Sequence, residues 1–162
     1  MMRHLYLLVL LLLMTAISAA AQTAAKFPAD FLAFLKQADE AQVELQGGNA
    51  SNYKKLWSNT DDVTLSGGFG GKVEKGWKAV SERLDWAATQ FANGTNSIER
   101  IVVAAEGNIG YLIQVEHIKF KVPSTGLEAS RDYRVTMIFR RERGRWKIMH
   151  RHADSQTSKQ PA

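Results

Sequence analysis

The stretch that decides the fold is "YRVTMIFRRERGRWKIMHRHAD", residues 133–154. Apolar and polar residues alternate on either side of "ERGR", residues 142–145, which predicts two antiparallel strands joined by a tight hairpin. The second strand carries His150 and His152. Residues two apart on a regular strand share a face, so the pair could belong to a metal site, a catalytic pair or a purely structural strand.

Two more strands precede this hairpin. "SIERIVVAAEGN", residues 97–108, and "IGYLIQVEHIKFKV", residues 109–122, are joined by Gly107 and Asn108, a tight-turn signal. The strand before the "ERGR" turn extends back to Glu128. The second half of the chain therefore predicts a long antiparallel meander.

Helical periodicity dominates the first half of the chain. We expect helices over residues 27–48, 49–59 and 75–94, with a short strand and a glycine-rich turn over residues 61–71. The first helix has one apolar face, formed by Phe31, Leu35, Ala38, Gln42 and Leu45, with Phe34 and Ala41 beside them. Helices followed by strands indicate an α+β fold, in which three helices pack on a strongly curved antiparallel sheet and leave a cavity at the open end of a cone.

The first 21 residues have the features of a secretory signal. A short basic start is followed by an apolar run from Leu5 to Met14 and by small residues at Ala19 and Ala21. We expect cleavage before Gln22, a periplasmic or secreted protein, and no membrane attachment afterwards. The domain is expected over residues 27–154, with a disordered polar tail at residues 155–162.

Composition excludes several classes of function. The chain has no cysteine, so it has no disulfide, thiol nucleophile or thiolate ligand. Its formal charge of +5 at pH 7 is concentrated in the "RRERGR" hairpin tip, which we interpret as a solvated turn and not as a nucleic-acid surface. The glycines of "GGFGG", residues 67–71, are not followed by the Gly-Lys-Ser/Thr of a phosphate-binding loop.

Three stretches resemble the SnoaL-like branch of the superfamily named for nuclear transport factor 2. These are "LWSNTDDVTLSGGFGG", "KGWKAVSERL" and the 133–154 hairpin. The resemblance spans residues 27–154 and implies a cone-shaped, cystatin-like fold and a homodimer formed through the sheet. It implies no particular activity, because members use the cavity differently. The last hairpin is also similar to the association domain of calcium/calmodulin-dependent protein kinase.

Catalytic and metal sites are weakly indicated. In the steroid isomerases of this superfamily the base is an acid on the first strand, and the resemblance places Gly67 there, which cannot take a proton. Asp62, Asp85 and Asp132 remain candidate bases. A metal held by the two histidines would need further ligands, which the sequence spacing does not enforce, and we expect no metal or cofactor.

The ligand-site prediction comes from the kinase resemblance, which places Arg134 at one of three pocket arginines, with Ile113 and Ala153 at the other two. Arg134 could hold an anionic or carbonyl group, or form a buried ion pair with Asp132 or Asp62. Trp57 and Tyr111 are candidate aromatic walls, and His117 and His150 complete the candidate ligand-binding set. The kinase alignment and regular alternation assign opposite faces to the end of the last strand, and a bulge would reconcile them.

We expect a homodimer through the sheet face that bears Val135, Met137 and Phe139, because an exposed face this apolar would aggregate. The expected function is binding of a small hydrophobic or weakly anionic molecule. The alternatives are a periplasmic isomerase or hydrolase with a histidine or aspartate base, and an assembly module that acts through its sheet face.

Overall fold

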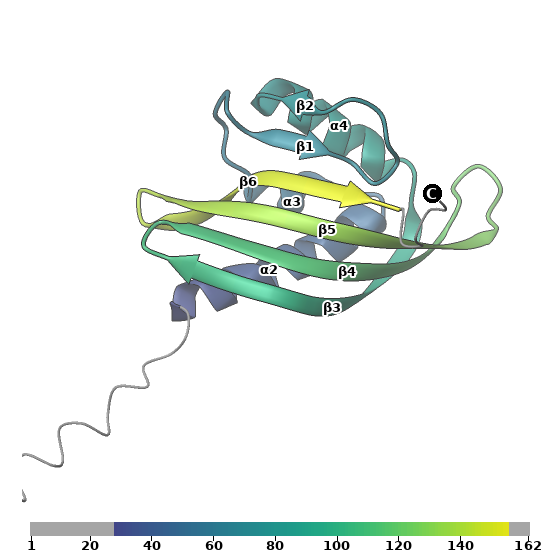
Figure 1. The fold of residues 1–162 in the computed structure, drawn as a ribbon. Helices are drawn as coiled ribbons and strands as arrows, with labels where there is room; N and C mark the ends of the chain where they lie inside the picture. Colours follow the sequence, from purple (N-terminus) through teal and green to yellow (C-terminus); the bar gives the residue numbers. More distant parts are fainter. Residues whose placement is uncertain (1–27, 156–162) are drawn as a thin grey trace, which may run out of the picture.

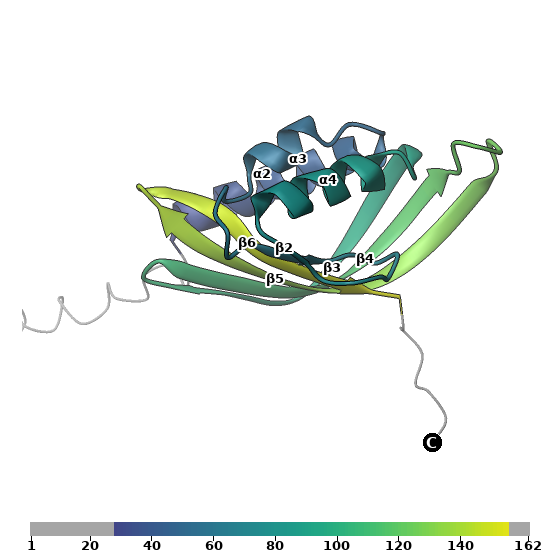
Figure 2. The same ribbon diagram turned by 90° about the horizontal axis from the view of Figure 1, so that it is seen from above.

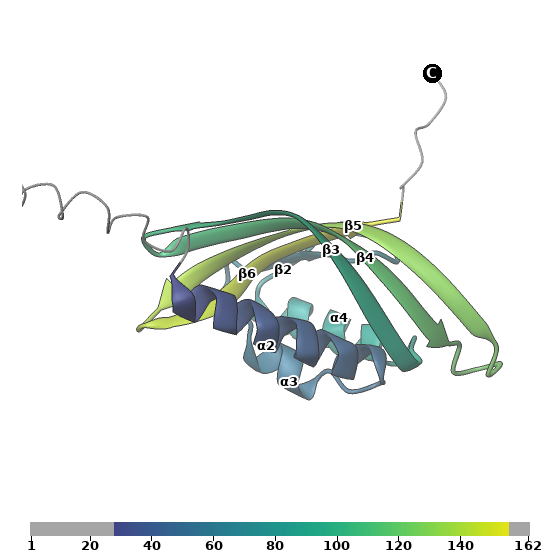
Figure 3. The same ribbon diagram turned by 90° about the horizontal axis from the view of Figure 1, so that it is seen from below.

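Three helices lie on one face of a sheet that curves around them (Figures 1, 2 and 3). The computed structural model describes residues 28–155, so the expected signal sequence with its cleavage site and all but the first residue of the expected tail lie outside the described residues. The helices are α2 (Ala29–Gln46), α3 (Ser51–Lys55) and α4 (Trp77–Ala88). None of the helices in residues 28–155 is long and apolar enough to cross a membrane.

The sheet has six strands in the order β2-β1-β6-β5-β4-β3. The strands are β1 (Thr64–Ser66), β2 (Glu74–Lys75), β3 (Ala92–Glu106), β4 (Ile109–Lys121), β5 (Glu128–Glu142) and β6 (Arg145–Asp154). β3 to β6 form the expected antiparallel meander, and β1 joins it in parallel beside β6. The prediction of an α+β fold with three helices on a curved sheet is confirmed, although one strand pair is parallel.

The apolar face of α2 forms the centre of the core. Every residue assigned to that face from the sequence is buried in the structure. The Phe31 ring meets the Phe139 ring edge-on, with centroids 5.4 Å apart, and lies 4.7 Å from the ring of Trp146. Aromatic pairs at this spacing add to the free energy gained by burying their area. The first helix is therefore held against the last hairpin, although the two segments are far apart in the sequence.

The third helix is shorter than its sequence pattern predicts. It ends at Ala88, and β3 begins at Ala92, so Asn93 and Gly94 belong to a strand and do not end the helix. A Cβ atom at Gly94 would lie 2.5 Å from the carbonyl oxygen of Gln46. Only glycine lets β3 pass this close to the end of α2, which is a reason for glycine that helical periodicity does not reveal.

The sheet face that was predicted to form the dimer is the buried face of the sheet. Val135, Met137 and Phe139 are 1%, 3% and 0% exposed, because α2 and the rest of the helical layer cover them. That face is the core of the chain and is not available to a second copy. The opposite face carries the exposed apolar residues Ile101, Ile109, Tyr111, Ile113 and Ile138.

Candidate functional site

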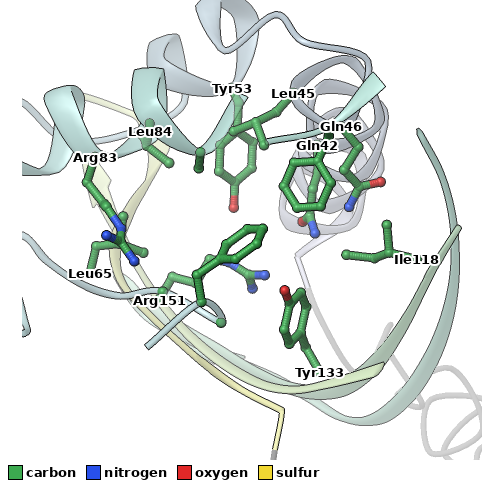
Figure 4. Close-up of a pocket in the computed structure, with 15 residues that line it drawn as sticks. Gln42, Leu45, Gln46, Tyr53, Leu65, Arg83, Leu84, Ile118, Tyr133 and Arg151 are labelled. Atoms are coloured by element: carbon green, nitrogen blue, oxygen red, sulfur yellow. The ribbon is translucent and has the colours of Figure 1, made fainter. Parts of the chain in front are cut away.

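A cavity of about 60 Å³ lies between the helices and the concave face of the sheet (Figure 4). Residues from all three helices and from β1, β4, β5 and β6 line it. Its polar walls are Gln42, Gln46, Tyr53, Arg83, Tyr133 and Arg151. Its apolar walls are Leu45, Leu65, Phe69, Leu84, Ala87, Phe91 and Ile118.

Two tyrosine hydroxyls point into this cavity from opposite sides. Tyr53 projects from α3 and Tyr133 from β5, and Figure 4 shows the two hydroxyls directed toward one another. The side chains are 1% and 3% exposed, and neither hydroxyl has a hydrogen-bond partner among the described residues. Arg131 approaches the Tyr133 hydroxyl, but a guanidinium only donates, so the phenolic proton still lacks an acceptor.

Both tyrosines remain neutral at physiological pH. Burial raises the pKa of Tyr53 well above its usual value of 10, and burial also raises the pKa of Tyr133. The amide oxygen of Gln46, which is 1% exposed, likewise has no partner among the described residues. The cavity therefore presents two neutral donors and one neutral acceptor that no other described group satisfies.

A buried ion pair forms the floor of the site. The guanidinium of Arg151 donates to both carboxylate oxygens of Glu116, at 2.9 Å and 3.2 Å. The side-chain amides of Gln42 and Gln114 each donate to the same carboxylate at 2.6 Å. Glu116 is 0% exposed and Arg151 is 9% exposed. The pair has no net charge, and the four donors satisfy the carboxylate as a buried charge requires.

A second layer supports this network from α2 and β3. Arg100 donates to the amide oxygen of Gln114 and pairs with Asp39. Burial raises the pKa of Asp39, and the neighbouring Arg100 opposes that shift. Both side chains are partly exposed, so this pair connects the buried network to the surface.

A bulge in β6 settles the orientation of the histidines. Phe139 pairs with Ile148, but Ile138 pairs with His150, so Met149 is an extra residue in the ladder. Before the bulge Trp146 and Ile148 face the helices, and after it Arg151 and Ala153 do. His150 and His152 therefore lie on the outer face of the sheet, away from the cavity. The bulge that would reconcile the kinase alignment with regular alternation is present, and it directs Arg151 inward.

None of the five predicted ligand-binding residues lines the cavity. Tyr111, His117 and Arg134 are on the outer face, where Arg134 pairs with Asp154 at 2.7 Å and His117 with Asp132 at 2.8 Å. The prediction that Arg134 lies in the cavity or in a buried pair with Asp132 or Asp62 is wrong. The residues directly before and after Arg134 in β5 face the helices, so Arg134 faces outward. The Arg134 side chain is 57% exposed.

His150 and Trp57 occupy structural positions. The Nδ1 atom of His150 lies 2.7 Å from the hydroxyl of Thr64 on the neighbouring β1. Burial lowers the pKa of His150, and the charge of His152 lowers it further. Trp57 is 1% exposed and packs edge-on against Tyr53, so it holds one of the two cavity tyrosines in place.

The candidate bases also lie outside the cavity. Asp62 accepts hydrogen bonds from Arg140 and Thr60, which hold its pKa at about 2. Asp85 pairs with Lys54 and Asp132 with His117. Within residues 28–155 no three histidine, aspartate or glutamate side chains are grouped to hold a metal ion.

A glycine-rich segment closes the cavity on one side, and we call residues 67–71 the flap. The ring of Phe69 lies 5.3 Å from that of Phe91 and 5.4 Å from that of Trp86. A Cβ atom at Gly68 would lie 2.4 Å from the ring of Tyr133, so the flap rests directly on this tyrosine. Arg83 holds the flap from α4 by donating to the carbonyl oxygen of Gly70 at 2.8 Å.

Sequence reasoning missed the residues that form this site. Gln114 and Glu116 interrupt a strand face that is otherwise apolar, with Leu112, Ile118 and Phe120 as neighbours. A charged residue in such a face must find a buried partner, and this signal could have directed the search to an arginine. No comparable signal exists for Arg151, because only the bulge turns it inward.

Comparisons with known proteins agree with this architecture. The sequence profile of the SnoaL-like domain matches residues 36–156, and the chain belongs to this family. A candidate dehydratase of the NTF2-like family from Streptomyces avermitilis is 18% identical, with a TM-score of 0.68, and the match covers 81% of this chain and 100% of that one. A comparison with curated proteins found no match.

Two further solved structures share the fold. A candidate calcium/calmodulin-dependent protein kinase II association domain from Xanthomonas campestris is 15% identical, with a TM-score of 0.66 and coverage of 86% and 95% of the two chains. An NTF2-like protein with a cystatin-like fold from Novosphingobium aromaticivorans is 17% identical, with a TM-score of 0.58 and coverage of 80% and 86%. At these identities the similarity shows the cystatin-like, cone-shaped fold and nothing about activity.

Proposed function

We propose that this protein binds a small molecule in the cavity between its helices and its sheet. The observation that carries the proposal is the set of unsatisfied polar groups on the cavity wall: the hydroxyls of Tyr53 and Tyr133 and the amide oxygen of Gln46. A buried polar group without a partner destabilises a protein by about 1–3 kcal/mol. Three such groups around one cavity are expected where a ligand supplies the partners.

The lining favours binding over acid–base catalysis. It contains no carboxylate and no imidazole, and the nearby carboxylate of Glu116 is fully occupied by four donors. The residue that the isomerase resemblance places at the base, Gly67, lies on the cavity wall and cannot carry a proton. The enzyme alternative is supported by two structural relatives, one described as a candidate dehydratase and one as a candidate ketosteroid isomerase.

The size of the cavity means that ligand entry requires movement. Pockets for drug-sized ligands measure roughly 300–1,000 Å³, whereas this cavity measures about 60 Å³. The flap is the wall suited to move, because its backbone has positive φ values at Gly70 and Gly71. The contacts that hold it are the ring cluster around Phe69, the Arg131 guanidinium 4.6 Å from the centre of that ring, and one hydrogen bond from Arg83. Displacing Phe69 would add the volume of its ring to the cavity.

Native mass spectrometry of the protein purified from its own source tests the binding function. We expect a retained mass that is lost when Tyr53 and Tyr133 are both replaced by phenylalanine, with the fold intact by circular dichroism. A retained mass unaffected by the double replacement would place the ligand elsewhere. The same spectrum tests export, since we propose that the mature periplasmic or secreted protein begins at Gln22.

We further propose that the protein is a homodimer that pairs the outer faces of two sheets. The support is the group of exposed apolar side chains on that face, of which Ile109 is 51% exposed and Tyr111 is 42% exposed. Contiguous apolar surface on a sheet is a mark of an interaction site. This face would also serve the assembly alternative, in which a different protein takes the place of the second copy.

A further inference from the structure

The charges and donors of the cavity indicate what class of molecule it selects, and this inference rests on the proposed binding function. We propose that the ligand is an uncharged, largely apolar molecule with one carbonyl-type oxygen, which accepts hydrogen bonds from Tyr53 and Tyr133 together.

The donors define the polar end of the ligand. The two phenolic protons approach the same space from α3 and β5, and neither has an acceptor among the described residues (Figure 4). Because both tyrosines stay protonated at neutral pH, each offers a proton and no negative charge. A carbonyl oxygen has two lone pairs and can accept from both hydroxyls at once.

The charged groups of the cavity favour a neutral ligand over an anion. Arg151 is the cation on the cavity floor, and Glu116 binds its guanidinium through both carboxylate oxygens. Arg83 is the other lining cation, and it donates to Gly70 while its guanidinium lies 4.2 Å from the centre of the Trp86 ring. A ligand carboxylate would lose its hydration and could pair with Arg83 only by displacing the contacts of this guanidinium with Gly70 and Trp86.

The remaining wall defines the body of the ligand. Leu45, Leu84, Phe91 and Ile118 surround the space beside the hydroxyls, and Phe69 covers it. Apolar surface of this kind favours an aromatic or aliphatic body of the size of one ring once the flap moves. The polar and apolar walls together describe a small ketone, aldehyde, ester or amide in preference to an acid.

Three probes of similar shape separate these classes: acetophenone, benzoate and ethylbenzene. Each would be titrated by calorimetry into the wild-type protein and into Phe69→Ala, with backbone amide shifts used to locate binding at the cavity. We expect acetophenone to bind more tightly than ethylbenzene and benzoate. Tyr53→Phe and Tyr133→Phe should each weaken acetophenone binding about three- to tenfold, the loss of one hydrogen bond, and leave ethylbenzene unchanged.

The two tyrosine variants carry an internal control for folding. Because each replacement removes an unsatisfied hydroxyl, the ligand-free variants should unfold at the same or a higher temperature than the wild type. Benzoate binding at the cavity more tightly than acetophenone, with dependence on Arg83, would overturn the ligand class and leave the binding function standing. If no probe binds at the cavity of either protein, this inference fails, and the binding function is decided by the retained mass in native mass spectrometry.

Discussion

Replacing Glu116 by glutamine should strongly destabilise the fold, and the structure indicates by how much. The carboxylate is 0% exposed and accepts four hydrogen bonds no longer than 3.2 Å. The amide has the same shape but no charge, so it leaves the guanidinium of Arg151 buried without a counter-charge. Breaking a buried pair in this way reduces the free energy of unfolding by about 3–5 kcal/mol, a large part of the roughly 5–15 kcal/mol that stabilises a typical domain.

Urea denaturation measures this loss, and Arg134→Gln is the matched control. That variant breaks the pair of Arg134 with Asp154 on the outer face, where the two side chains are 57% and 33% exposed. Solvent screening limits an exposed pair to about 0–1 kcal/mol. Equal losses for the two variants, or a loss below about 1 kcal/mol for Glu116→Gln, would refute the assignment of the buried pair as the main electrostatic contact of the core.

Three further predictions concern the flap, the outer histidines and the second copy. Gly68→Ala places a methyl group 2.4 Å from the Tyr133 ring, so hydrogen exchange of the flap amides should accelerate; Gly67→Ala, whose Cβ would meet only the end of the Arg83 side chain at 3.3 Å, should leave it nearly unchanged. The pKa of His150 is lowered in the folded state by burial and by His152. The unfolded chain therefore takes up a proton at a higher pH than the folded protein does, and the free energy of unfolding should fall as the pH drops below about 6.5. His150→Gln should flatten this part of the urea midpoint–pH profile, and an unchanged profile would count against the shift. Ile113→Glu places a charge on the outer apolar face and should give a monomer in light scattering, whereas an unchanged dimer would locate the interface elsewhere.

The sequence was sufficient for the helices and the meander because those patterns are local. The buried face of α2 could be read from its spacing, and each hairpin carries its own turn residues. The assignment of the sheet faces was not local. On β5 the alternation by itself favours burying the face that carries Val135, Met137 and Phe139, but the kinase resemblance placed the opposite face, with Arg134, in the cavity. The structure places Val135 inside and Ile138 outside.

The residues that face the cavity from β6 depend on a single extra residue in that strand. A single extra residue at Met149 exchanges the faces of everything that follows it in β6. Without knowledge of this bulge, His150 remained a candidate for the cavity and Arg151 was not a candidate. Glu116 was visible as a charge on an apolar face, but its partner lies 35 residues further along the chain, and no spacing rule connects them.

The parallel pairing of β1 with β6 has a consequence for the order of folding. Thr64 aligns with His150, so the β1–β2 pair joins the rest of the sheet through a strand that is synthesised after most of the domain. Such distant contacts carry a large loop-closure entropy and slow the folding reaction. Until β6 arrives, Glu116 has no counter-charge and the floor of the cavity does not exist. A nascent chain that stops before residue 145 would therefore leave Glu116 unpaired and expose the open edge of β5, and unpaired strand edges are a feature that calls for chaperones.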